Sequence, residues 1–139
     1  MNRTYRVSLV LVLAAAFAAC GGADSSSTAR KPGSNKPANA AAAVGAKEAR
    51  QVFDSLCFTC HGMTGHGDGP GAAALDPKPR TFADVAWQDS VTDEQIVKTV
   101  LFGGAAVGKS PMMPAQPQLK GKDEVLKALV KIVREFRGK

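Results

Sequence analysis

Residues 57–61 constrain this chain more than any other part of it, because they read Cys-Phe-Thr-Cys-His. Two thiols separated by two residues, with a histidine directly after the second, form the CxxCH pattern that attaches haem c covalently. The thiols of Cys57 and Cys60 can each bond one vinyl group of the porphyrin. The imidazole of His61 can then ligate the iron. Since the pattern occurs once, we expect one covalent haem c.

Two other interpretations of the cysteine pair, a zinc site and a dithiol redox pair, fit the surrounding sequence less well. A zinc site needs four ligands, and outside residues 57–61 the chain offers only Cys20 and His66. A thioredoxin-like pair opens a helix after a buried strand, whereas residues 46–56 have the apolar spacing of an amphipathic helix. Haem attachment is therefore the interpretation that we favour.

The N-terminal residues have the layout of a secretory signal. Arg3 and Arg6 precede an uncharged run over residues 7–19, which is too short to span a bilayer. We therefore expect residues 1–19 to be a signal peptide and the protein to be exported to the periplasmic side of a membrane.

Residues 17–21, Phe-Ala-Ala-Cys-Gly, resemble a bacterial lipobox, although Phe17 stands where that motif usually has leucine. The lipobox cysteine receives lipid and becomes the first residue of the mature protein. The resemblance therefore implies that Cys20 anchors the protein to a membrane through lipid. The alternative is ordinary cleavage in the alanine-rich stretch, which leaves Cys20 as a free thiol or removes it.

The rest of the chain divides into a tether and a domain. Residues 20–45 are rich in Ala, Ser, Gly, Pro and Asn and have almost no large apolar side chain. Such a segment cannot bury enough surface to offset its ordering entropy, so we expect a flexible tether after Cys20. Residues 46–139 then form one small domain, whose modest core a buried porphyrin would enlarge.

Three segments of this domain have helical patterns, and none has the alternation of a strand. Residues 46–56 and 123–137 carry apolar side chains at helical spacing. Residues 92–102 begin with a capping-box pattern and stop before a pair of glycines. The sequence therefore predicts an all-α domain with three main helices and long Gly/Pro-rich loops.

With the elements in this order, residues 46–139 resemble a class I monohaem cytochrome c of the bacterial, electron-shuttling kind. The shared features are an N-terminal helix, CxxCH, a Gly-rich loop ending in Gly-Pro, a middle helix, a Met-Pro loop and a C-terminal helix. The resemblance implies that the first and last helices cross around one haem. The residues implied at this crossing are Ala49, Phe53, Val133 and Phe136.

The resemblance also implies two further site residues. The second axial ligand would be a methionine directly before a proline, which favours Met113 and leaves Met112 as the alternative. An iron with both axial positions filled has no open site for a substrate. The carbonyl of Pro70, in the Gly-Pro turn, would accept a hydrogen bond from the His61 imidazole and raise its basicity.

Arg80 and Trp87 lie between the CxxCH motif and the middle helix, and both carry N–H donors suited to carboxylates. We therefore expect them to contact the haem propionates. The alternatives are a solvated arginine and a tryptophan packed in the core. Phe82 is among the candidates for packing against the haem.

Together these features predict an electron-transfer protein and not an enzyme. It would pass single electrons between membrane or periplasmic redox partners such as an oxidase or a reductase. The alternative function is a haem-based sensor or a peroxidase-like protein with an open iron site. The net charge of +6 includes Arg3 and Arg6 of the expected signal, and it does not imply a nucleic-acid partner. No small-molecule substrate is expected.

Overall fold

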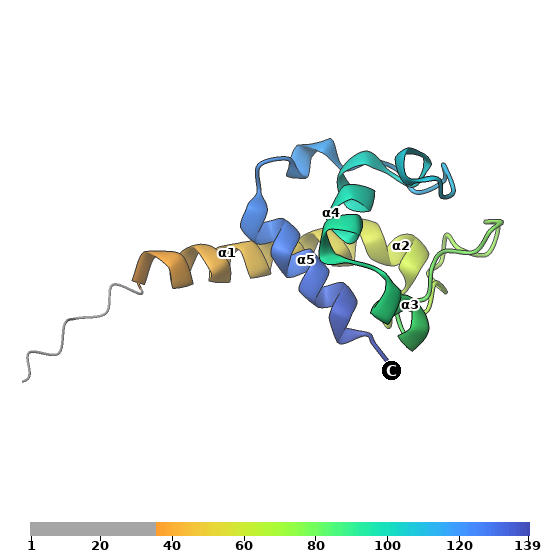
Figure 1. The fold of residues 1–139 in the computed structure, drawn as a ribbon, viewed down its shortest axis with the longest axis horizontal. Coiled ribbons are helices and arrows are strands. Elements are labelled where there is room, and N and C mark those ends of the chain that lie inside the picture. Colours follow the sequence, from red (N-terminus) through yellow and green to blue (C-terminus); the bar gives the residue numbers. More distant parts are fainter. Residues whose placement is uncertain (1–35) are drawn as a thin grey trace, which may run out of the picture. The chain divides into compact units, whose positions relative to one another are not determined.

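The computed structural model describes residues 36–139, so the expectations for residues 1–19, for Cys20 and for the start of the tether lie outside the described residues. In chain order the elements are α1 (Lys36–Val52), a π-helical turn η1 (Phe53–Cys57), α2 (Phe58–His61), α3 (Val85–Ser90), α4 (Asp93–Phe102), 3-10 turns η2 (Ala105–Val107) and η3 (Pro117–Leu119), and α5 (Asp123–Glu135). Residues 36–139 contain no strand, which confirms the predicted all-α fold (Figure 1). Within this range, no helix has both the length and the apolar character needed to cross a membrane.

Helix α1 begins at Lys36, whereas the sequence predicted a helix from residue 46 and a flexible tether before it. The prediction was wrong for residues 36–45 because it considered only how much surface this segment can bury. Alanine has the highest intrinsic helix propensity and loses no side-chain entropy in a helix. The alanine-rich residues 38–44 are therefore helical although their side chains are exposed.

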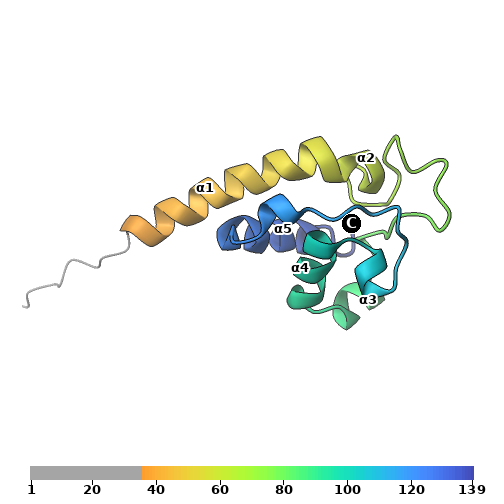
Figure 2. The ribbon, with the colours of Figure 1, turned by 90° about the horizontal axis from the view of Figure 1, so that it is seen from above.

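Helices α1 and α5 pack against each other, and Figure 2 shows them side by side. They approach each other closely at the buried Gly45, where an added Cβ would lie 2.7 Å from the Cβ of Glu124. Directly after these two helices the packing is aromatic: the ring centroids of Phe53, in η1, and Phe136, which follows α5, are 5.6 Å apart. Ala49 and Val133 belong to the same buried core, so the helix crossing that the resemblance implied is present.

Helix α4 has the predicted cap. The Oγ1 of Thr92 accepts a hydrogen bond from the backbone N–H of Gln95, and the Oε1 of Gln95 accepts one from the N–H of Thr92. The short helix α3 was not predicted. It begins after Asp84, whose carboxylate accepts a hydrogen bond from the N–H of Trp87, and its six residues are too few for a helical period to be recognised.

A buried amide joins α3 to α5. The side chain of Gln88 is 4% exposed, and its Nε2 donates hydrogen bonds of 2.8 Å to the carbonyls of Phe82 and Val133. Its Oε1 accepts one of 2.9 Å from Arg134, which also donates to the carboxylate of Asp93 at 2.7 Å. This network fixes the segment before α3 against the C-terminal helix.

We predict that Gln88→Leu lowers the free energy of unfolding by roughly 2–4 kcal/mol, because it removes the buried side-chain hydrogen bonds to the carbonyls of Phe82 and Val133 and to Arg134. The exposed Gln118 is the matched control, since it bonds only to the side chain of Gln116. Gln118→Leu should change the free energy of unfolding by less than about 0.5 kcal/mol. Denaturant titration of both variants measures the difference, and equal midpoints would contradict this role for Gln88.

Candidate haem-binding site

The CxxCH residues lie at the end of one run of helical backbone. Cys57 ends the π-helical turn η1, and Cys60 and His61 belong to α2. Single π-helical turns within α-helices occur frequently at functional sites. Both thiols are free and partly buried. The two cysteines and the histidine are therefore available together on one short helical segment.

The surroundings of Cys57 favour its protonated thiol. Burial, with a further contribution from the charge of Cys60, raises the pKa of the Cys57 thiol to about 11. Redox-active and metal-binding cysteines have lowered pKa values, because their thiolate is the reactive form. Moreover, residues 36–139 contain no group of three His, Cys, Asp or Glu side chains that could hold a metal ion. The zinc and dithiol interpretations therefore lack support in the described part of the chain.

The imidazole of His61 is oriented by a backbone carbonyl. Its Nδ1 lies 3.2 Å from the carbonyl oxygen of Arg80, and because a carbonyl can only accept, Nδ1 carries the proton. Burial lowers the pKa of His61, and this hydrogen bond partly opposes the shift. The neutral ring therefore presents an unprotonated Nε2, the form in which imidazole binds a metal.

This arrangement corrects the expectation for Pro70, whose carbonyl was to accept that hydrogen bond. The Gly-Pro turn packs elsewhere: the N–H of Gly69 donates to the carbonyl of Cys60 at 3.2 Å, and the N–H of Gly71 donates to that of Thr59 at 2.7 Å. These carbonyls have no partner within the short helix α2, and the turn satisfies them. Pro70 itself is exposed.

Arg80 and Trp87, the predicted propionate contacts, lie beside each other. The guanidinium carbon of Arg80 is 5.8 Å from the centroid of the Trp87 ring, and its Nη1 is 3.4 Å from Asp84. Trp87 in turn stacks on Phe82, with ring centroids 5.6 Å apart. The structure thus brings the two residues together, and their contact with propionates stays a prediction.

The loop that carries Met112 and Met113, called here the methionine loop, packs against Gly103 and Gly104, which directly follow α4. The N–H of Gly104 donates to the carbonyl of Met113 at 3.0 Å. A Cβ on Gly104 would collide with the carbonyl oxygen of Ser110, and one on Gly103 would lie 2.9 Å from the carbonyl oxygen of Met113. Only glycine allows this close approach. Met113 is partly buried, whereas Met112 is 58% exposed.

Apolar side chains are exposed around these two segments. Leu56 directly precedes the motif and Met63 follows it closely, while Phe102 and Met112 lie at either end of the loop after α4. Both segments are at the same end of the domain (Figure 1). Large apolar side chains exposed near the CxxCH motif and near Met113 are available to contact an apolar group such as a porphyrin. Two free thiols, an imidazole with a free Nε2, a thioether and these side chains fit a haem c.

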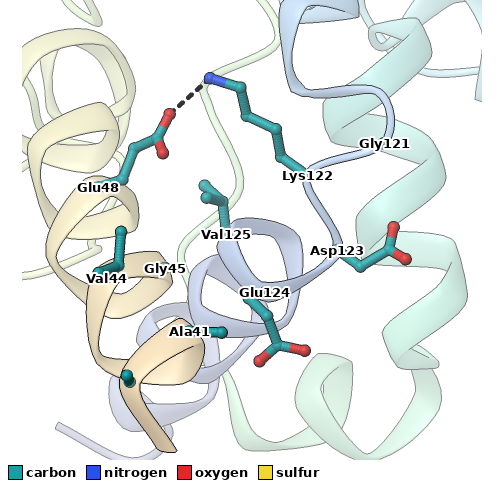
Figure 3. Close-up of a pocket in the computed structure, with 10 residues that line it drawn as sticks. Ala41, Val44, Gly45, Glu48, Gly121, Lys122, Asp123, Glu124 and Val125 are labelled. Atoms are coloured by element: carbon teal, nitrogen blue, oxygen red, sulfur yellow. Dashed lines mark hydrogen bonds and ion pairs between the residues drawn. The ribbon is translucent and has the colours of Figure 1, made fainter. Parts of the chain in front are cut away.

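Two shallow pockets lie outside this region. The first is between α1 and α5, where an ion pair of 2.6 Å joins Glu48 and Lys122 (Figure 3). The second is lined by side chains of α4 and α5. Neither pocket includes a CxxCH residue, so the candidate site rests on the side chains described above.

Sequence reasoning missed the backbone groups and the aromatic contact of this site. Arg80 was selected for its guanidinium, but its carbonyl is the group that contacts His61. Phe82 was considered only for packing against the haem, whereas it stacks on the His61 ring with 4.4 Å between centroids. A carbonyl acceptor carries no residue-type signal, since every residue has one.

Comparisons with known proteins identify the family of the chain. The family described as cytochrome C oxidase, cbb3-type, subunit III matches residues 44–131. No curated protein matches the chain. A solved structure titled KustC0563 c-type cytochrome is 32% identical, with 64% of this chain and 96% of that chain covered and a TM-score of 0.49. The chain therefore belongs to the cbb3-type subunit III family of cytochrome c domains, and it is a class I cytochrome c whose chemistry is haem-based electron transfer.

Proposed function

We propose that this protein is a non-enzymatic electron carrier with one haem c, attached through Cys57 and Cys60 and ligated by His61 and Met113. The observation that carries the proposal is the state of His61, whose Nδ1 is committed to the Arg80 carbonyl and whose Nε2 is free. The chemistry that a bound haem c supplies is one-electron exchange between ferric and ferrous iron.

The residues of the chain support this function at two places. At His61, the hydrogen bond to the carbonyl of Arg80 holds Nδ1 of the imidazole and increases the basicity of the ring as a ligand. After α4, the hydrogen bond from Gly104 to the carbonyl of Met113 holds the methionine loop in place. An imidazole and a thioether would fill both axial positions, so no substrate could reach the iron.

Family membership supports redox proteins as partners, and an oxidase complex is the partner class that the matching family names. The proposed place of action is the periplasmic side of a membrane, with Cys20 as the lipid anchor. This part of the proposal rests on the sequence pattern of residues 1–21. Mass spectrometry of the mature N-terminus tests it directly, since a lipidated Cys20 would then be the first residue.

The test of the proposed ligands is an absorption spectrum of protein matured in a host with haem-attachment machinery. We expect covalent haem and, in the oxidised protein, the weak long-wavelength sulfur-to-iron charge-transfer band. Met113→Ala should abolish that band and retain the covalent haem, because Met113 is the partly buried methionine of the methionine loop. Met112→Ala, which changes the exposed neighbour, is the matched control and should retain the band.

Two outcomes would contradict this assignment. Loss of the band in Met112→Ala but not in Met113→Ala would show that Met112, and not Met113, is the axial ligand. Covalent haem without the band in the unmodified protein, together with carbon monoxide binding in the ferrous state, would indicate an open iron site and hence a sensor or a peroxidase-like protein.

A further inference from the structure

We propose that Phe82 is a positioning residue for the proximal ligand: its stacked ring sets the plane in which the His61 imidazole meets the iron. This inference rests on the proposed function, in which His61 is that ligand. The two rings are 4.4 Å apart between centroids and are inclined by only 16°.

A hydrogen bond alone does not fix the plane of an imidazole. The contact between Nδ1 of His61 and the carbonyl of Arg80 holds one ring atom, and the ring can still turn about that direction. An aromatic ring lying flat on one face opposes this turning, because a tilt would separate or overlap the two stacked surfaces. Arg80 and Phe82 are two residues apart, so one short segment supplies both constraints.

Phe82 can act in this way because its own position is fixed at several points. The residue is 8% exposed, and its N–H donates to the carbonyl of Gly65 at 2.6 Å. Its carbonyl accepts from the buried Gln88 side chain at 2.8 Å. The ring is also stacked on Trp87 and Phe136, with centroids 5.6 and 6.2 Å away. Because Phe82 is well packed and is held by its backbone, its ring can keep the His61 ring in a fixed orientation.

The consequence concerns the electronic state of the iron. Groups that contact a metal-bound histidine fix its tautomer and ring orientation, and they tune the metal. Axial ligands and their surroundings are among the means by which a protein sets the reduction potential of a haem. A change at Phe82 should therefore be visible at the iron and not only in the stability of the fold.

The experiment compares Phe82→Leu with Phe82→Tyr in the holoprotein. Phe82→Leu removes the flat ring and keeps an apolar side chain, whereas Phe82→Tyr keeps the ring. Phe53→Leu is the control for loss of an aromatic core side chain, because Phe53 is 1% exposed and packs in a tilted arrangement against Phe136. For each variant we measure the electron paramagnetic resonance spectrum of the ferric protein, the midpoint potential and the thermal unfolding temperature.

We expect Phe82→Leu to shift the g values and the midpoint potential beyond the experimental error. Phe82→Tyr should have the g values and the potential of the unmodified protein. Phe53→Leu should lower the unfolding temperature and leave the g values unchanged. If Phe82→Leu yields no folded holoprotein, Phe82→Met, whose unbranched side chain adapts more easily to the space left by the ring, takes its place with the same expected shifts.

Wild-type g values and potential in the Leu or Met variant would overturn the proposal, as would equal shifts in Phe53→Leu. These results are distinct from a failure of the proposed function. In that case the unmodified protein itself would lack covalent haem or a low-spin ferric spectrum.

Discussion

His61→Ala is expected to abolish the low-spin haem spectrum and to lower the yield of covalent haem protein by about tenfold or more. The reason is that it would remove the proposed ligand to the iron, whereas loss of a group that only supports a ligand already costs about 10–100-fold in metal affinity. The neutral, carbonyl-oriented imidazole of His61 has no substitute among residues 36–139, where the only other histidine is the exposed His66.

His66→Ala is the matched control for this experiment. His66 contacts only the hydroxyl of Thr64 among the hydrogen bonds of the described residues, and it is exposed. Its replacement should leave the spectrum and the yield unchanged. A haem stain and an absorption spectrum of both variants, expressed side by side, measure the result. Equal loss of haem in the two variants would contradict the assignment of His61 as the ligand.

The second large effect is expected at Gly69, which packs against the backbone of the CxxCH segment. A Cβ at this position would overlap the carbonyl oxygens of Phe58 and Thr59 and lie 2.6 Å from the carbonyl carbon of Thr59. Because those atoms are backbone, they cannot move aside as a flexible side chain could. Gly69→Ala should therefore lower the free energy of unfolding by roughly 3–5 kcal/mol, through overpacking and loss of the turn that caps α2.

Gly121→Ala separates this steric effect from the general cost of replacing a glycine. Gly121 has a φ of +81° and no atom within 4 Å of an added Cβ, so only backbone strain of roughly 1–2 kcal/mol is expected there. Denaturant titration gives both values. Equal destabilisation of the two variants would show that the close approach at Gly69 does not control folding.

The sequence patterns predicted those parts of the fold that depend on local rules. The capping box at Thr92 and the apolar face of α5 are each formed by residues that are close together in the sequence. These patterns therefore identified α4 and α5. The start of α1 was misjudged because helix propensity without burial leaves no apolar pattern. The short helix α3 was missed because its cap at Asp84 is formed by a side chain that could equally begin a turn.

The candidate site was predictable to the extent that its chemistry is carried by side chains at fixed spacing. Cys57, Cys60 and His61 are such side chains. The partner of the imidazole was not predictable, because a carbonyl from residue 80 reaches it only through the folded loop. The stacking of Phe82 on His61 likewise joins residues twenty-one positions apart and depends on the whole packing of α3 and α5.

The early start of α1 determines how far the candidate site lies from residue 36. From Lys36 to His61 the backbone is helical almost without interruption, a length of about 40 Å at 1.5 Å per residue. Lys36 and His61 therefore lie at opposite ends of this helical run. The candidate site therefore lies at the far end of this helical run from residue 36, where the described part of the chain begins.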